Sequence, residues 1–298
     1  MLMQKNNFIF DRDTLLHLRL PFSFFLLPVY LFALSQTKHI NYMNAIIVFI
    51  SLHFFIYPAS NLYNSFMDQD KGSIGGLRNP PPATRKLYIA SMWLDALGLI
   101  LCLLINIKMM LLMIVYISVS KVYSWHGIRL KKYALTGWLV VILFQGGYTF
   151  LLVNMAAENL LDLQWFTVKH KLCMLLATLL IGGFYPLTQV YQHEEDSERG
   201  DRTISYKLGI KGTFIFSAVM FIVACIVAWI YFTRFYNLLQ FEIFIACLIP
   251  VVLYFLNWLR KVMKNEMLAD YIHTMRMTML SSVCMIICYS TLLWLNYQ

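Results

Sequence analysis

Two polar segments that lie far apart in the chain repeat one arrangement of side chains. The first carries Asn64 and Asp68, and the second carries Gln192 and Asp196. In each pair an amide precedes an aspartate by four residues, which places both side chains on one face of a helix. Mg²⁺ prefers oxygen ligands and commonly combines one or two carboxylates with the phosphates of a substrate. The two segments together predict a magnesium site for a polyphosphate.

Additional charged residues flank both pairs. Asp70 reaches the same site as Asp68 only if the helix has already ended, which Gly72 and the glycines and prolines after it favour. Glu195 directly precedes Asp196 within an acidic run, and nearby Arg and Lys side chains would bind the remaining phosphate charge. The expected metal ligands are Asp68, Asp196, Asn64, Asp70, Glu195 and Gln192.

The elements that must position these residues are membrane-spanning helices. Hydrophobic residues make up 60% of the chain and charged residues only 13%, compared with roughly 25% charged residues in soluble domains. A span needs about 20 apolar residues, and only helices satisfy their own backbone groups there. We expect one domain, residues 1–298, with an all-α fold: a polytopic bundle of about nine transmembrane helices. The expected spans are 18–36, 42–64, 87–106, 108–125, 135–155, 172–191, 212–232, 240–259 and 272–296.

Lys and Arg residues gather at the N-terminus and in the even-numbered loops. By the positive-inside rule these parts, which include both polar segments, face the cytoplasm. If residues 87–125 did not form two spans, the chain would have eight, and this assignment of the loops to the cytoplasm would fail. The net charge of +9 is therefore an orientation signal, and no aromatic–basic motif indicates a nucleic-acid partner. We expect an integral protein of the bacterial cytoplasmic (inner) membrane, in contact with the lipid bilayer.

The two motifs, at the ends of the second and sixth spans, resemble the two signatures of the UbiA superfamily of intramembrane prenyltransferases. Tyr123 and Ser124, followed by Arg129 and Lys131 after the fourth span, are also similar to that family. The resemblance implies a bundle around a central cavity that is open toward lipid and capped by the acidic loops. It further implies Mg²⁺-dependent transfer of a prenyl group from a prenyl diphosphate to a hydrophobic acceptor, with an aromatic one foremost.

The resemblance also implies roles for individual residues. The catalytic residues would be Asn64, Asp68 and Asp196. The diphosphate would be bound by Lys71, Arg78, Arg129, Lys131, Arg202 and Tyr123. Metal and cationic side chains would stabilise the departing diphosphate, and a dry cavity would protect the allylic cation from water. Asp95 is an ionisable residue inside the third span, where it would contact the acceptor, line the cavity, tune a proton transfer or pair with another helix, the pair being slightly favoured.

The chain departs from the family pattern at several positions. Gly72 and Gln192 stand where members often carry aspartate, and Ser65 replaces a common acidic residue. An inactive homologue therefore stays open, as does a membrane terpene cyclase that ionises the same donor without an acceptor. A lipid or small-molecule carrier is an alternative of another class. It predicts polar groups near the bilayer midplane, whereas the conspicuous clusters here lie at one membrane face, which favours the enzyme.

Overall fold

Nine helical segments of the computed structural model are long and apolar enough to cross a membrane. The structure describes residues 8–159 and 166–297, and all nine segments lie within these ranges. Their limits are Arg12–Ser35, Tyr42–Asp68, Arg85–Ile105, Ile107–Ser124, Ala134–Glu158, Val168–Glu198, Ile204–Phe235, Leu238–Lys264 and Tyr271–Asn296. Each expected span overlaps one of these segments. The prediction of an all-helical bundle with nine spans is therefore confirmed.

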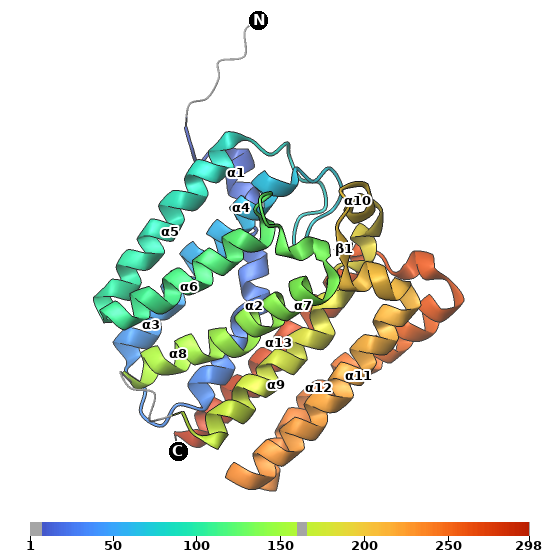
Figure 1. The fold of residues 1–298 in the computed structure, drawn as a ribbon. Helices are drawn as coiled ribbons and strands as arrows, with labels where there is room; N and C mark the ends of the chain where they lie inside the picture. Colours follow the sequence, from blue (N-terminus) through green and yellow to red (C-terminus); the bar gives the residue numbers. More distant parts are fainter. Residues whose placement is uncertain (1–7, 160–165, 298) are drawn as a thin grey trace, which may run out of the picture.

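The first four spans are built from seven helical elements (Figure 1). They are α1 (Arg12–His17), α2 (Leu20–Ser35), α3 (Tyr42–Ile50), the π-helical turn η1 (Ser51–Ile56), α4 (Tyr57–Asp68), α5 (Arg85–Ile105) and α6 (Ile107–Ser124). A π-helical turn inserts an extra residue into a helix, and such turns are frequent near functional sites.

The remaining spans follow a short 3-10 turn, η2 (Leu130–Lys132). The elements are α7 (Ala134–Ile142), the π-helical turn η3 (Leu143–Tyr148), α8 (Thr149–Glu158), α9 (Val168–Phe184), α10 (His193–Glu198), the two-residue strand β1 (Arg202–Thr203), α11 (Ile204–Phe235), α12 (Leu238–Lys264) and α13 (Tyr271–Asn296). Helix α9 ends at Phe184, earlier than the continuous helix expected over 172–191. The chain then passes through the 3-10 turns η5 (Tyr185–Thr188) and η6 (Val190–Gln192), where Pro186 cannot donate a backbone hydrogen bond.

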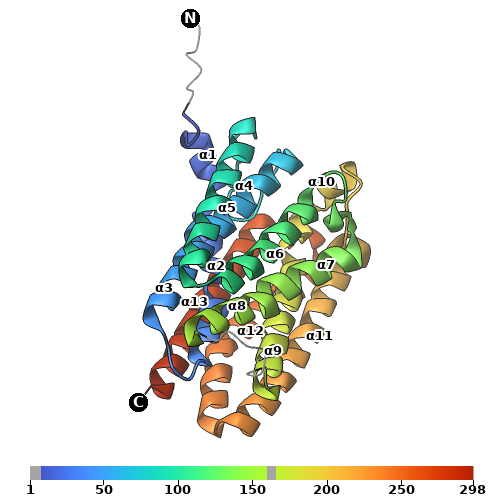
Figure 2. The ribbon, with the colours of Figure 1, turned by 60° about the vertical axis from the view of Figure 1, so that its left-hand side comes forward.

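The first and last spans lie side by side. Helix α2 packs along both α13 and α8, while α11 packs along α9 and α4 packs along α5 (Figures 1 and 2). The largest buried cluster joins α2, α3, α8, α9, α11 and α13, and it includes Phe32, Phe150, Tyr231 and Tyr289. This packing leaves the ends of α4, α6 and α10 together at the upper end of the bundle in Figure 1.

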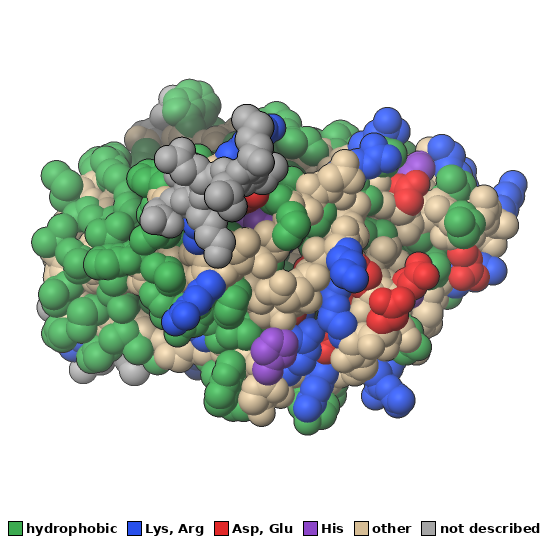
Figure 3. All heavy atoms as spheres, turned by 90° about the horizontal axis from the view of Figure 1, so that it is seen from above, with side chains coloured by type: hydrophobic (Ala, Val, Ile, Leu, Met, Phe, Trp, Pro, Cys, Tyr) green, Lys and Arg blue, Asp and Glu red, His purple; other side chains and the backbone are tan. Residues whose placement is uncertain are grey.

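Charged side chains gather on that end of the molecule. Seen from above, most of the Lys, Arg, Asp and Glu side chains in view lie in the half of the face on the side of α10 and β1 (Figure 3). Two bonds join the acidic segments there, because the backbone N–H groups of Lys71 and Gly72 donate to Oε1 of Glu195 at 3.0 and 2.8 Å. The expectation that the two segments meet on one face is therefore met by the fold.

Two glycines bring the π-helical turn η3 against the backbone of α9. A Cβ atom on Gly146 would lie 2.8 Å from Cα of Thr178 and 2.9 Å from the carbonyl of Ala177. The neighbouring Gly147 N–H donates to Oγ1 of Thr178 at 3.1 Å. Small residues at such a crossing let two membrane helices approach closely.

Replacing Gly146 by alanine is expected to lower the free energy of unfolding by about 1–3 kcal/mol, because the new methyl group would collide with backbone atoms that cannot move aside. Gly212→Ala is the matched control, since a Cβ there meets only the Cβ atom of Leu208, at 3.4 Å. Thermal unfolding of both variants in the same detergent provides the measurement. Equal midpoints for the two variants would show that the crossing tolerates a methyl group.

Candidate active site

A polar cavity of about 210 Å³ lies where α4, α6, α7 and the α9–α10 connection meet. Seven of the residues expected at the site line it: Asn64, Asp68, Asp70, Tyr123, Lys131, Gln192 and Asp196. They come from three segments that are remote in the sequence. The fold therefore assembles both amide–aspartate pairs around a single space.

Asp70 enters this cavity because α4 ends two residues before it. Asp68 is the last residue of the helix, and Gln69 adopts a left-handed conformation with φ of 54° that reverses the chain. The helix thus ends early enough for Asp70 to face the same cavity as Asp68. Gly72 follows Asp68 by four residues, but because the helix has already ended, Gly72 does not lie on the helical face of Asn64 and Asp68.

A network of buried ion pairs holds Asp68. Its carboxylate pairs with Nζ of Lys131 and, at 3.2 Å, with Nη2 of Arg129. Arg129 also forms a bidentate pair with Asp201, at 2.7 and 2.8 Å. Burial by itself would lower the pKa of Arg129, but the bonds to Asp201 and Asp68 raise it overall. The network connects α4, the α6–α7 loop and the segment before β1.

A second ion pair joins the two acidic segments directly. Nη2 of Arg199 lies 2.5 Å from Oδ1 of Asp70 and 3.4 Å from Oε2 of Glu195. Burial raises the pKa of Asp70, and the nearby charge of Asp68 raises it further, while Arg199 opposes both effects. Burial would lower the pKa of Arg199, yet the neighbouring carboxylates leave it raised. Both groups are outside the spans, at the rim of the bundle.

The structure gives Glu195 a different position from the one predicted for a metal ligand. Its carboxylate accepts from the backbone of Lys71 and Gly72, pairs with Arg199 and does not line the polar cavity. A Cβ atom at Gly72 would lie 3.0 Å from Oε2 of Glu195. An aspartate at position 72 would bring two carboxylates together, which explains why glycine suits this chain there. Adjacent Asp196 is the acidic residue that faces the cavity.

Most of the expected diphosphate ligands also lie elsewhere. Lys71, Arg78 and Arg202 are exposed and do not line the cavity. Arg129 does not line it either, but it forms ion pairs with Asp68, which does, and with Asp201. Lys131 and Tyr123 do line the cavity. Position in the sequence near a motif was therefore a poor guide to where a long basic side chain points.

Asp95 forms an ion pair within the bundle. Its Oδ2 lies 2.7 Å from Nζ of Lys121, and that ammonium also stands over the ring of Tyr63 at 4.3 Å. Asp95 lines neither of the two cavities described here. Of the roles expected for it, the structure supports pairing with a neighbouring helix and gives no support to contact with an acceptor.

Arg19 and Arg199 also line the cavity, although the motifs alone did not assign them to it. Arg19 is the left-handed residue between α1 and α2, and among the described residues it donates only to carbonyl oxygens, of Gly75 and Asn61. Its Nε atom is buried without a partner. A basic side chain near the start of the first span is also expected as an orientation signal, so the residue type and position of Arg19 did not distinguish the two roles.

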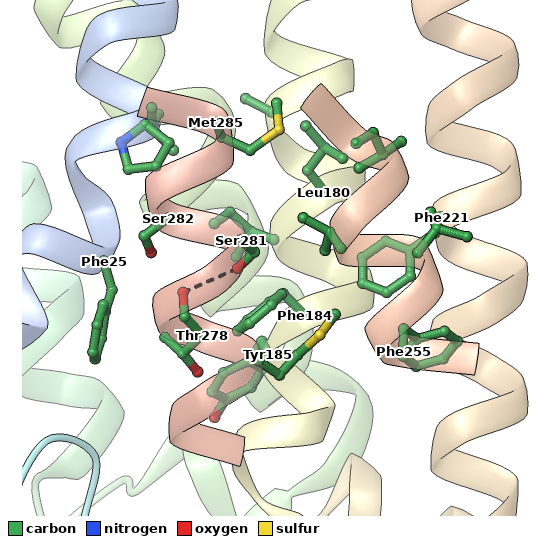
Figure 4. A pocket seen from close by; sticks show the side chains of 18 of the residues that line it. Phe25, Leu180, Phe184, Tyr185, Phe221, Phe255, Thr278, Ser281, Ser282 and Met285 are labelled. Carbon is green, nitrogen blue, oxygen red and sulfur yellow. Dashed lines mark hydrogen bonds between the residues drawn. The ribbon is translucent and has the colours of Figure 1, made fainter. Parts of the chain in front are cut away.

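A larger apolar cavity of about 650 Å³ adjoins the polar one (Figure 4). It lies among α2, α9, α11, α12 and α13, and Figure 4 shows Tyr185 and Thr278 at one end and Met285 toward the other. Six residues line both cavities: Phe22, Phe25, Gln145, Tyr185, Thr188 and Thr278. The two spaces therefore meet, and a molecule with a charged head and an apolar tail fits across the junction.

The polar residues suit Mg²⁺ as part of a ternary complex. Within the described residues no three His, Cys, Asp or Glu side chains form a metal-binding group on their own. Asp68, Asp70, Asp196 and Asn64 nevertheless face one cavity, and among the described residues the buried Oδ1 of Asp68 has only its 3.2 Å ion pair with Arg129 as a partner. Mg²⁺ needs only one or two carboxylates when substrate phosphates supply further oxygens. The side chains present therefore fit an ion whose remaining ligands come from a bound diphosphate.

Comparison with known proteins identifies the family. The profile of the UbiA prenyltransferase family matches residues 23–281. The chain belongs to this family. It is thus a UbiA-type transferase of prenyl groups, and the resemblance carried by the two motifs is confirmed. A search of curated protein sequences found no match to the chain.

Solved UbiA structures share its fold. The apo structure of a UbiA homologue from Aeropyrum pernix K1 has a TM-score of 0.67 at 15% identity, covering 94% of this chain and 99% of that one. A homologue from Archaeoglobus fulgidus bound to GPP and Mg²⁺ has a TM-score of 0.64 at 18% identity, covering 93% and 99%. A structure from work on digeranylgeranylglyceryl phosphate synthase in membranes has a TM-score of 0.60 at 19% identity, covering 95% and 97%.

The buried ion pairs of this UbiA protein generate a test of stability. Asp201→Asn should lower the free energy of unfolding by about 2–4 kcal/mol, because Arg129 would lose a charged partner in a buried site. Glu266→Gln is the control, since Glu266 and its partner Lys211 are each about half exposed, at 48% and 49%, and such pairs contribute below about 1 kcal/mol. Chemical unfolding in detergent measures both, and equal losses would contradict the network's importance.

Proposed function

We propose that this protein transfers a prenyl group from a prenyl diphosphate, bound together with Mg²⁺, to a hydrophobic acceptor in the membrane, with an aromatic acceptor foremost. The observation that carries the proposal is the junction of the two cavities. One holds carboxylates and cations, the other is lined by apolar side chains, and six residues border both. This division matches the two chemically different ends of a prenyl diphosphate.

The polar cavity provides both kinds of group that such a donor requires. Asp68 and Asp196 would hold the metal, assisted by Asn64 and Asp70, and the bound ion would supply charge neutralisation for the departing diphosphate. Lys131, Arg199 and Arg19 line the same cavity and would bind phosphate oxygens. In the structure Lys131 and Arg199 pair with Asp68 and Asp70. These cations would exchange carboxylate for phosphate partners when the donor binds.

The side chains at the junction would control the reaction itself. The bond between the first prenyl carbon and the diphosphate oxygen breaks, and its electron pair leaves with the diphosphate. A carbon of the acceptor supplies the electron pair for the new bond and then loses a proton to the released diphosphate. Phe22, Phe25 and Tyr185 border this point, so their rings would exclude water and face the allylic cation. Tyr185 is held there by hydrogen bonds with Tyr123 and Gln189.

The solved relatives support the choice of donor and metal. One Archaeoglobus fulgidus homologue structure contains GPP with Mg²⁺, and another contains DMAPP with Mg²⁺. We place the site on the cytoplasmic side of the bacterial inner membrane, because the described Lys and Arg residues at that end of the bundle agree with the positive-inside rule.

The proposal is tested by donor turnover in nanodiscs with a panel of prenyl diphosphates and aromatic acceptors. Asp196→Asn should reduce Mg²⁺-dependent product formation by at least about 100-fold, because it removes a charged ligand of the leaving group's metal. Glu198→Gln is the control, since Glu198 is exposed in the same short helix and does not line the cavity. Chelation of Mg²⁺ should abolish turnover by the wild-type protein.

Binding of a non-hydrolysable prenyl diphosphate analogue gives a second readout. The analogue should bind wild type only with Mg²⁺ and should bind Asp196→Asn at least about tenfold more weakly. Cyclised hydrocarbon released without any acceptor would assign the protein to the terpene cyclases instead. Unchanged turnover in Asp196→Asn would remove Asp196 from the site and overturn the metal assignment.

A further inference from the structure

Four polar side chains border both cavities: Gln145, Tyr185, Thr188 and Thr278. The hydroxyl of Tyr185 bonds with two neighbouring side chains, and those of Thr188 and Thr278 each donate to a backbone carbonyl, at 2.7 and 2.8 Å. The amide of Gln145, in contrast, has no hydrogen bond to any residue within 8–159 and 166–297. Because an amide both donates and accepts hydrogen bonds, the junction contains an unused recognition group.

Gln145 lies deep within its span. It follows Ala134, the first residue of α7, by eleven residues, which corresponds to about 16 Å along a helix. It belongs to the π-helical turn η3, in which the next two residues, Gly146 and Gly147, contact α9. An unpaired amide at this depth is costly. Its presence therefore points to a bound group that satisfies it.

The proposed donor does not supply that group. Its tail is hydrocarbon and has no hydrogen-bonding atom, and its diphosphate belongs with the charged side chains. The charged residues that line the polar cavity are Arg19, Asp68, Asp70, Lys131, Asp196 and Arg199, and all of them come from helix ends or short elements at the end of the bundle. The partner of Gln145 is therefore expected on the second substrate, the acceptor.

One wall of the polar cavity has an uncharged lining beside Gln145. Its residues come from α6, α7 and η3, and we refer to six of them as the α6–η3 wall: Tyr116, Val119, Ser120, Val140, Phe144 and Gln145. The rings of Tyr116 and Phe144 lie 6.1 Å apart in an edge-to-face arrangement, which provides aromatic surface for the ring of an acceptor. None of these six side chains could neutralise a carboxylate.

We propose that Gln145 binds the hydroxyl group of an uncharged phenolic acceptor whose ring lies against the α6–η3 wall. This inference rests on the proposed prenyl-transfer function and adds the chemical class of the acceptor. The amide oxygen accepts a hydrogen bond from the phenolic O–H, so both groups are satisfied in the cavity. A carboxylate in the same place would be buried without a cation from the wall, which disfavours acidic aromatic acceptors.

The same hydrogen bond would assist the reaction. A ring carbon next to the hydroxyl supplies the electron pair of the new carbon–carbon bond, while the breaking carbon–oxygen bond leaves its pair on the diphosphate. Positive charge then spreads over the ring and onto the hydroxyl oxygen, which makes the O–H a stronger donor. Its bond to Oε1 of Gln145 therefore strengthens in the transition state. The ring carbon loses its proton to the diphosphate, and the hydroxyl keeps its own.

The test compares naphthol with methoxynaphthalene, its methyl ether, which has a similarly electron-rich ring but no hydroxyl proton. With the donor that the wild-type protein uses best, kcat/KM for naphthol should exceed that for the ether by at least about tenfold. Gln145→Leu should lower kcat/KM for naphthol by at least about tenfold and leave that for the ether within about twofold, because only naphthol loses a hydrogen bond. A hydroxynaphthoate with its carboxylate on the second ring should be used at least about tenfold less well than naphthol.

Leu143→Ala is the control, since Leu143 lies in the same π-helical turn, is 49% exposed and lines neither cavity. Its kcat/KM for naphthol should stay within about twofold of the wild-type value. Mg²⁺-dependent binding of the donor analogue shows that each variant is folded. Gln145→Met, which keeps the length of the side chain, repeats the test should Gln145→Leu unfold.

Unchanged naphthol turnover in Gln145→Leu, or equal losses for naphthol and the ether, would overturn the proposal. A wild-type protein that uses the ether or the hydroxynaphthoate as well as naphthol would do the same. So would a wild-type protein that binds the donor analogue with Mg²⁺ but does not prenylate naphthol. Absence of Mg²⁺-dependent binding of the donor analogue would instead contradict the proposed transferase function, so the two failures are distinguishable.

Discussion

Pairing of buried charges is the constraint on which the site depends. Asp68 lies at the end of an apolar helix, where an unpaired carboxylate would be costly, and it obtains its partners Lys131 and Arg129 from another loop. Arg129 in turn requires Asp201 from a third segment. Neutralising these charges thus draws together segments that are remote in the sequence. The same requirement leaves a set of cations and carboxylates around one cavity, ready to exchange partners with a charged ligand.

The boundary between that cavity and the apolar one divides the chemistry into two environments. The charged side chains of the polar cavity lie at one end of the bundle, whereas the cavity among α2, α9, α11, α12 and α13 is lined mainly by hydrocarbon and aromatic side chains. Tyr185 and Gln145 border both. A reactive cation formed at this boundary would be close to the departing anion yet shielded from water on the other side.

The amide–aspartate spacing picked out residues that share one cavity, because the spacing of side chains along a helix is a local property. Asn64, Asp68, Gln192 and Asp196 all line the polar cavity. Glu195 was indistinguishable from Asp196 by residue type, but one helical step turns its carboxylate toward the backbone of Gly72. Arg19 was counted only as an orientation signal, because its approach to the cavity depends on a left-handed residue between two helices. Long basic side chains reach in several directions, so neighbourhood in sequence does not place them.

The sequence by itself determined that the chain crosses a membrane nine times as helices, since runs of apolar residues and backbone hydrogen bonding are local and leave no other solution. It also determined the family, through motifs whose spacing lies within single segments. Tertiary structure alone decided which carboxylates face the cavity, which cations neutralise them and where the apolar space meets the polar one. Those outcomes depend on the direction of the chain after each helix ends and on partners from distant segments, such as Asp201 for Arg129 and Phe255 for Phe221.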